Sequence, residues 1–340
     1  MKTDKRILIT LLILTTMKKL FLICAALMLS CAMGTAQNTK FGKPSQLDWS
    51  MVGWSEAPDA EAIVLCKTLN VEYELQSDFK SYDNSTSELS AESVAYGGAG
   101  INKFISEDKI TMTYSVKMRT KILKDSGAKY ANLDIVYYWE EKDRTHSDDI
   151  SSLSIVVFDN STGKVKKRKL NSSCWTEERL DANYMVRHIR VADVKAGDII
   201  EYQYDLTSRR ATFLYDWQVQ EDIPVLYTKC EMNIPAFLTF NMSVPVHPFV
   251  KSKVEEASVT LPQEISDLQA PKKIKSNYYT IESRDMLPKA LDLQRRQSET
   301  PAATVGGEGD FEALKAILSI KAEAPVPMPK GKRHIMINPE

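Results

Sequence analysis

Residues that build metal sites and covalent frameworks are scarce in this sequence. It has five cysteines and four widely separated histidines in 340 residues, and none of the CxxC, HxH or HExxH spacings that ligate zinc. A phosphate-binding loop is also missing, because Tyr96–Gly100 lacks the Lys-Ser/Thr pair and the following helix. His146 lies in the acidic stretch 140–149, where a solvated loop is a simpler interpretation than a weak cation site. We therefore expect no metal and no cofactor.

The chain has no excess of charge of either sign. Its 44 basic and 45 acidic residues give a formal net charge of −1, which supplies no positive field for nucleic acid. We expect no nucleic-acid partner. The one basic concentration is Lys164–Lys169. On a strand its charges alternate between two faces, which favours an edge strand protected by lysines over a binding site for an anionic envelope polymer.

Long apolar runs are absent after the N-terminus. The two stretches Ile7–Thr16 and Leu20–Leu29 are separated by Lys18 and Lys19, and each is too short to cross a bilayer. No later segment reaches the roughly 18 apolar residues that a spanning helix needs. We therefore expect no transmembrane span in the mature chain.

Residues 1–36 have the pattern of a secretory signal peptide. The segment that begins at Met17 holds a basic start, an apolar centre and a small-residue exit, so translation starts at Met1 or at Met17. Gly34 and Ala36 provide the small residues for cleavage after Ala36. This predicts export to the periplasm or the medium. The alternative is a lipoprotein anchored through Cys31, because Met28–Cys31 loosely resembles a lipobox.

The mature chain keeps an odd number of cysteines, namely Cys66, Cys174 and Cys230. The exported compartment permits disulfides, and three thiols form at most one internal pair. The sequence leaves open whether any pair forms. The fold must be held together by its core.

Strand patterns dominate the rest of the chain. Residues 108–124 alternate apolar and polar side chains, as a half-buried strand does. We expect hairpins over 108–139, 154–170 and 198–220, and prolines separate four further strand-like runs. Those runs are 225–233, 238–244, 252–261 and 276–282. The predicted fold class is all-β, with one or more large antiparallel β-sandwiches and a short C-terminal amphipathic helix.

The expected organisation follows from these patterns. A lead-in precedes one β domain, which includes a Ser-, Asn- and Gly-rich surface insertion and could divide into two sub-sandwiches near residue 235. A linker follows, then a helix over Asp310–Ala322 and an extended tail. The tail 301–340 is either a docking arm or a disordered end. The predicted ranges are 37–58 for the lead-in, 59–285 for the domain, 76–107 for the insertion, 286–308 for the linker and 309–340 for the end.

Four successive motifs carry a family resemblance: Asp59–Leu65, Arg119–Gly127, Ala196–Tyr202 and Trp217–Val225. In this order they resemble a bacterial family of unknown function that stands before transglutaminase-like domains in secreted or envelope proteins of Gram-negative bacteria. The resemblance covers roughly residues 55–285 and implies a large β-sandwich. Its landmark residues are Asp59, Arg119, Gly127, Gly197, Asp198, Tyr202, Trp217 and Pro224.

Each landmark also has a structural explanation. Gly127 and Gly197 suit turns that need a residue without a Cβ atom. Arg119, on the polar face of a strand, suits a salt bridge or a carbonyl contact across the sheet. Trp217 suits a core anchor with its N–H bonded, and Pro224 a strand terminator. We interpret them as structural residues.

A transglutaminase-like site needs a cysteine, a histidine and an orienting Asp or Asn. The one candidate set is Cys174, His188 and Asp193, which lie within 20 residues of each other inside the β domain. In the related enzymes the triad is spread over a separate domain, and 55 residues after position 285 are too few for it. We expect a half-buried thiol and a surface imidazole, and no catalytic residues.

Three functions remain, in decreasing order of support. The first is a non-catalytic envelope protein that binds or scaffolds. The second is an accessory subunit that captures an envelope glycan or peptide for a separate enzyme, with stacking surfaces from exposed aromatic residues. The third is a cryptic thiol enzyme that uses Cys174. The candidate stacking residues are Tyr137, Tyr138, Trp139, Tyr278 and Tyr279.

Overall fold

The structure is a computed structural model. It describes residues 39–75, 110–142, 144–236, 238, 240–244, 247–260, 273–299 and 319–323. The expected signal peptide 1–36 and the expected insertion 76–107 lie outside these residues. None of the helices in the described ranges is long and apolar enough to cross a membrane.

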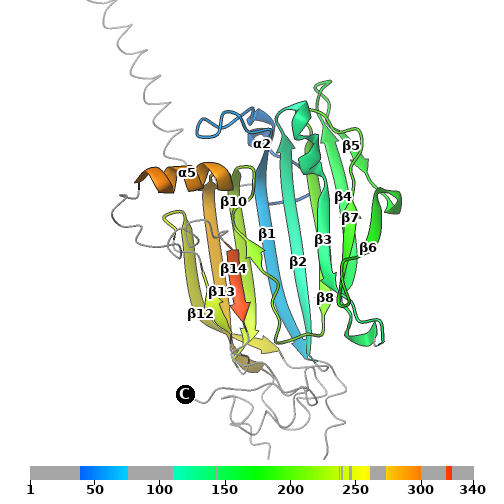
Figure 1. The fold of residues 1–340 in the computed structure, drawn as a ribbon, viewed down its shortest axis with the longest axis vertical. Helices are drawn as coiled ribbons and strands as arrows, with labels where there is room; N and C mark the ends of the chain where they lie inside the picture. Colours follow the sequence, from blue (N-terminus) through cyan, green and yellow to red (C-terminus); the bar gives the residue numbers. More distant parts are fainter. Residues whose placement is uncertain are drawn as a thin grey trace, which may run out of the picture. The chain divides into compact units, whose positions relative to one another are not determined.

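One large mixed sheet organises the chain. It has eight strands in the order β12-β13-β10-β1-β2-β8-β4-β5 (Figure 1). The pairing of β1 with β10 is parallel and the other pairings are antiparallel, so the sheet is mixed rather than wholly antiparallel as expected. The strands are β1 (Ala62–Leu75), β2 (Ile110–Ile122), β4 (Asp149–Asp159), β5 (Lys166–Lys169), β8 (Ile199–Ser208), β10 (Val225–Pro235), β12 (Val250–Thr260) and β13 (Lys273–Met286).

Two three-stranded sheets accompany the large one. Their orders are β3-β7-β6 and β11-β14-β9. Buried side chains of β3, β7 and β9 join those of the large sheet in one hydrophobic cluster, which makes a second layer on one face of that sheet. The strands are β3 (Leu133–Tyr138), β6 (Trp175–Arg179), β7 (Tyr184–Ile189), β9 (Trp217–Gln218), β11 (Asn241–Ser243) and β14 (Ser319–Glu323).

Helical segments are short. Within the described residues the α-helices are α2 (Gln46–Ser50) and α5 (Lys289–Glu299), and the 3-10 turns are η4 (Asp125–Ala131), η5 (Arg144–His146) and η6 (Ser172–Cys174). The predicted mostly-β sandwich class with a short C-terminal helix is therefore confirmed. The predicted helix position was wrong, since α5 lies inside the expected linker. Ser319–Ala322, the described part of the predicted helix, belongs to β14 because its backbone pairs with β9 and β11. The remainder of that predicted helix, 310–318, lies outside the described residues.

The strand alternation is realised most clearly in β2. Ile110, Met112 and Tyr114 are buried in the main core, while the residues between them face the other side of the sheet. Of the expected hairpins, the one over 154–170 is confirmed as β4 and β5, with Gly163 in its turn at a φ of 73°.

The other two predicted hairpins were wrong. The chain leaves β2 through η4 and enters β3, which pairs with β7 in the second layer. Likewise β8 pairs with β2 and β4, and within 211–220 only Trp217–Gln218 is strand. An alternating pattern fixes which face of a strand is buried, but it does not identify the partner strand.

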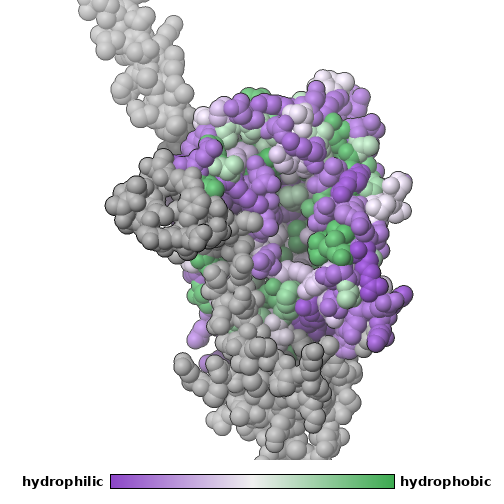
Figure 2. All heavy atoms as spheres, in the orientation of Figure 1, coloured by the Kyte–Doolittle hydropathy of each residue, from purple (hydrophilic) through white to green (hydrophobic). Residues whose placement is uncertain are grey.

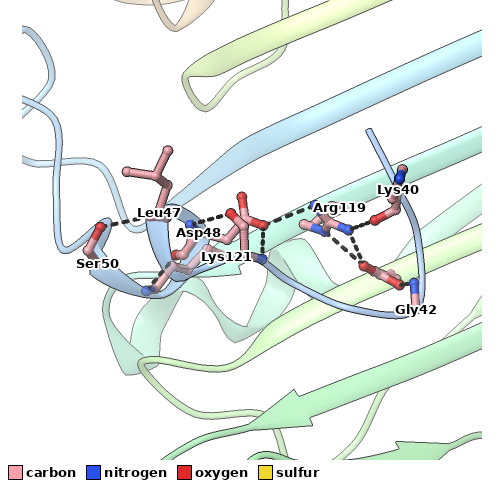
Figure 3. A network of polar contacts seen from close by, with 9 residues as sticks. Lys40, Gly42, Leu47, Asp48, Ser50, Arg119 and Lys121 are labelled. Atoms are coloured by element: carbon pink, nitrogen blue, oxygen red, sulfur yellow. Dashed lines mark hydrogen bonds and ion pairs between the residues drawn. The ribbon is translucent and has the colours of Figure 1, made fainter. Parts of the chain in front are cut away.

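Arg119 joins the N-terminal segment, residues 39–54, to the large sheet (Figure 3). This segment lies on the face that the two small sheets do not cover. The Arg119 side chain is fully buried on β2 and donates hydrogen bonds to Glu201 directly across on β8, with Nε 2.8 Å from Oε1. Its Nη1 donates to Asp48 of α2 at 3.0 Å, and its Nη2 donates to the Lys40 carbonyl. One guanidinium thus binds two buried carboxylates and a backbone carbonyl.

Further contacts complete this attachment. Ser45 and Asp48 form a reciprocal capping box at the start of α2. Lys121, two residues after Arg119, donates to the Trp49 carbonyl at 2.6 Å. A small second core lies beside these bonds, with Ile63, Leu65, Phe158 and Ile199 buried and Trp49, Met51 and Trp54 packed against them. The segment 39–54 is therefore a fixed part of the fold.

We expect Arg119→Met to destabilise the protein by roughly 3–5 kcal/mol, because Asp48 and Glu201 would stay buried without their cation. Urea unfolding followed by circular dichroism measures the loss. Lys117→Met, on the same face of the same strand, is the matched control and should change stability by no more than about 0.5 kcal/mol. A loss below about 1 kcal/mol for Arg119→Met would show that the two carboxylates do not depend on it.

Candidate functional site

A cleft of about 540 Å³ lies over the main core face of the large sheet. Strands β1, β2 and β8 form its floor, β3 forms one wall, and residues 215–223 form the other. Figure 2 shows this face hollowed, with hydrophobic residues inside the hollow. The second layer thus leaves part of the large sheet uncovered between β3 and β9.

The floor of the cleft is apolar. Val116 and Met118 of β2 and Tyr204 of β8 pack against the core while remaining partly exposed to the cleft. They share one face because alternate residues of a strand point the same way. The Tyr204 hydroxyl makes no hydrogen bond within the described part of the chain. Burial raises its pKa, so it stays protonated and is able to donate a hydrogen bond.

Trp217 belongs to the far wall, where Lys67 of the floor strand β1 contacts it. The Lys67 ammonium lies 4.5 Å from the centroid of the Trp217 ring, donates to the Gln218 carbonyl at 3.2 Å and pairs with Glu221. The Trp217 indole N–H donates to Thr228 Oγ1 at 3.1 Å, which fixes the ring against β10. The cation in the cleft is therefore compensated by the protein itself.

The near wall is β3. Leu133 and Ile135 face the core, while Asp134 and Val136 are exposed. The Asp134 carboxylate accepts from Arg190 Nη1 at 2.5 Å and lies 2.9 Å from His188 Nδ1. The hydrogen bond from Arg190, with a smaller contribution from His188, holds the Asp134 pKa below its usual value. This carboxylate is ionised at neutral pH.

The structure places two of the predicted landmarks in the cleft. Tyr202 and Trp217 both line it, and the Tyr202 hydroxyl also donates to the Ala131 carbonyl. Arg119 lies outside the cleft, and the two landmark glycines serve turns. A Cβ atom on Gly127 would lie 2.1 Å from the Glu61 carbonyl oxygen, so only glycine fits there. Gly197 has a φ of 93°, where glycine is favoured.

The remaining landmarks hold backbone segments. Asp198 is buried and accepts a hydrogen bond from the Lys195 N–H at 3.1 Å. Burial raises its pKa. The Pro224 carbonyl accepts from the Val64 N–H at 2.9 Å, and the carbonyl of exposed Asp59 accepts from Lys124 Nζ at 3.0 Å. These three residues lie outside the cleft.

Cys174, His188 and Asp193 have separate environments. The His188 ring nitrogens face the carboxylates of Asp134 and Glu178, the latter at 3.2 Å. Cys174 packs against the core, and partial burial raises the pKa of its thiol. Asp193 is in a turn at a φ of 55°, where its carbonyl accepts from Arg168 Nη2 at 3.2 Å. The contacts of the histidine and the cysteine give no activated thiolate.

Of the five candidate stacking residues, only Tyr137 is buried, and the other four are partly exposed. Tyr137 is buried in the core, and Tyr138 packs edge-on against Tyr184. The Tyr278 hydroxyl donates to Glu231 at 2.7 Å. Sequence analysis missed Tyr204 and Tyr130 as aromatic cleft residues. The shared face of Tyr202 and Tyr204 was a visible signal, but it did not show that the second layer leaves that face uncovered.

The other sequence candidates are also placed. The three cysteines of the described residues are free, and burial raises the pKa of Cys66 and of Cys230 to about 12. Within the described ranges, no group of three or more His, Cys, Asp or Glu side chains could hold a metal ion. The basic run is an edge strand, as predicted, because β5 ends the large sheet.

Comparison with known proteins agrees with the resemblance carried by the landmarks. No curated protein matches this chain. Among solved structures it resembles a "putative protease" from Parabacteroides distasonis ATCC 8503, with a TM-score of 0.43 and 11% identity. The match covers 78% of this chain and 40% of that one, so this chain spans less than half of that protein. A family model described as a domain of unknown function with a solved structure, DUF3857, matches residues 109–288, more than half of the 340 residues. The chain therefore belongs to the DUF3857 family.

Proposed function

We propose that this chain is a non-catalytic binding domain of the cell envelope, and that its ligand enters the cleft between β3 and β9. The observation that carries this proposal is the cleft itself. Its volume of about 540 Å³ falls within the range of roughly 300–1,000 Å³ that ligand sites occupy. Its floor leaves apolar and aromatic side chains partly uncovered, which gives a ligand surface to bury.

The polar groups of the cleft also suit binding. Lys67 is paired with Glu221, and Asp134 with Arg190, so the charged groups already have counterions. Such groups orient a ligand without a large desolvation cost, because each charge keeps its partner. The neutral Tyr204 hydroxyl supplies a hydrogen-bonding group on the floor.

A non-catalytic role agrees with the chemistry of the cleft lining. The aromatic hydroxyls on its floor are protonated, since burial raises the pKa of Tyr202 and of Tyr204. The thiol of Cys174 is half-buried against the core and does not line the cleft. The groups that do line it favour holding a ligand over activating one.

The cellular location is part of the proposal. Residues 1–36 carry the features of an export signal, with cleavage after Ala36. We expect the mature protein to begin at Gln37, which N-terminal sequencing of protein from the source cell will check. Retention in the membrane fraction that is lost in Cys31→Ala would instead establish the lipoprotein.

A charge on the cleft wall tests the binding site. Val136 lines the cleft and is 43% exposed, while Val165, before β5, is 47% exposed and lies outside it. We expect Val136→Arg to reduce crosslinking of the chain to its envelope partner at least about fivefold, because a bulky cation at the rim blocks entry. Val165→Arg should leave it unchanged. Equal crosslinking by both variants would contradict the cleft as the binding site.

Thiol reactivity tests the non-catalytic assignment. Because the pKa of Cys174 is raised, less of it is thiolate at neutral pH, and iodoacetamide should label it more slowly than glutathione. Its rate should rise steadily with pH above 8, and Cys174→Ser should remove the labelling of the folded protein. A fast rate that reaches a plateau near neutral pH would instead indicate an activated thiolate and a cryptic enzyme.

A further inference from the structure

Within the described residues, the backbone of β3 is paired on one side only. It is an edge strand, since the order of its sheet is β3-β7-β6. The Trp139 N–H donates to the Asn183 carbonyl at 2.8 Å, in register with the antiparallel pairs Tyr137 to Met185 and Ile135 to Arg187. In an antiparallel ladder alternate residues hydrogen-bond to the partner. The odd-numbered residues of β3 therefore face β7.

The even-numbered residues of β3 present their backbone to the other side. Asp134 and Val136 line the cleft, and within the described ranges their N–H and C=O groups make no hydrogen bond. At Tyr138 the open edge ends, because its N–H donates to Asp148 Oδ2 at 3.0 Å and to the Tyr215 hydroxyl at 2.9 Å. Two residues at strand spacing thus offer two donors and two acceptors to the cleft.

Three other sheet edges, β5, β12 and β6, carry charged side chains that discourage pairing with another chain. Strand β5 has Lys166–Lys169, β12 has charges from Lys251 to Glu256, and β6 has charges from Glu177 to Arg179. The open part of β3 has one charged residue, Asp134, an exposed valine, no lysine and no proline. It is less protected against strand addition than β5, β12 and β6.

The opposite wall offers less backbone for pairing. Strand β9 has only two residues, and the Gln218 carbonyl already accepts a hydrogen bond from the Lys67 ammonium. A strand in the cleft would therefore pair mainly with β3. One face of that strand would lie on the apolar floor of Val116, Met118 and Tyr204, and the other would face outward beside Asp134.

Charge indicates what the outward face should carry. Asp134 is the charged residue of the open part of β3, and its carboxylate is half exposed although it pairs with Arg190. Opposite charges on directly facing strand residues attract each other. A basic side chain that faces Asp134 on an added strand would therefore join its ion pair with Arg190.

We propose that the cleft binds an extended peptide segment of a partner protein by adding it as a strand to β3. Apolar side chains at alternate positions lie on the floor, and a basic side chain between them faces Asp134. This inference rests on the proposed function, and it names the ligand class of the same site. Main-chain hydrogen bonds from Asp134 and Val136 supply affinity, and the floor supplies selectivity.

The test uses the exported chain and the fluorescein-labelled peptide Lys-Val-Lys-Val-Lys-Val-Lys, followed by fluorescence anisotropy. Two further peptides carry N-methyl groups, one on its valines and the other on its lysines. Each set removes the N–H groups along one edge of the strand. We expect saturable micromolar binding of the parent peptide, a loss of at least about tenfold for one methylated peptide and near-parent binding for the other. Equal behaviour of the two, or no saturable binding of the parent, would overturn strand addition.

Two variants of the protein assign the edge. Val136→Pro removes the cleft-facing N–H without removing a hydrogen bond to β7, and we expect it to weaken binding at least about tenfold. Val136→Thr keeps that N–H and should bind within about twofold of the parent chain. Thermal unfolding confirms that both variants fold. Equal binding of the peptide by the two variants would show that the Val136 N–H does not bind it, which contradicts strand addition to β3.

Two other occupants of the cleft, the chain's own tail and a second copy of the chain, would give different results in these binding experiments. Binding of the peptide only after removal of residues 324–340 would assign the cleft to the chain's own tail. A dimer that forms with concentration and is lost in Val136→Pro would assign it to a second copy. Either result would contradict the proposal that the cleft binds a peptide segment of a partner protein. If the peptide fails while Val136→Arg still abolishes envelope crosslinking, the cleft binds another ligand class and the proposed function stands.

Discussion

The buried guanidinium of Arg119 must be paired with negative charge, and several segments of this fold are arranged around that need. A buried cation is tolerated only with compensating charge and hydrogen bonds. Glu201 on the neighbouring strand supplies one carboxylate, and Asp48 supplies the other from a segment 71 residues away. The N-terminal segment must therefore cross β2 and β8, and this crossing buries the second core around Ile63 and Phe158. Removal of either carboxylate would leave charge unbalanced inside the protein.

The two faces of the large sheet consequently have different coverings. The N-terminal segment covers part of one face through polar bonds. The two small sheets cover the other through the main hydrophobic cluster. Because those sheets do not meet over β1 and β2, the cleft lies between β3 and the segment that holds β9. The candidate site is thus a gap in the second layer of the sandwich. The edge strand β3 lies beside the apolar floor formed by β1, β2 and β8 there.

Much of the fold was predictable because burial alternates with the strand period. The pattern at Ile110–Met118 predicted β2 and its buried face, and the turn cluster Asp159–Gly163 predicted the β4–β5 hairpin. Lys164–Lys169 indicated an edge strand for the same local reason, since lysine does not favour a central position. The partners of β2 and β3 were not predictable, because a period of two residues says nothing about which strand lies alongside.

The candidate site was predictable only in its parts. Trp217 and Tyr202 stood out as landmarks, yet their place beside an open cleft depends on where β3 and β9 end. By itself the sequence determined the predominance of strands, the buried face of β2 and the family, because these follow from composition, local order and periodicity. The tertiary structure alone decided the parallel β1–β10 pairing, the conversion of Ser319–Ala322 to strand and, within the described residues, the unpaired edge of β3. These features depend on contacts between segments far apart in the chain, and such contacts leave no local signal.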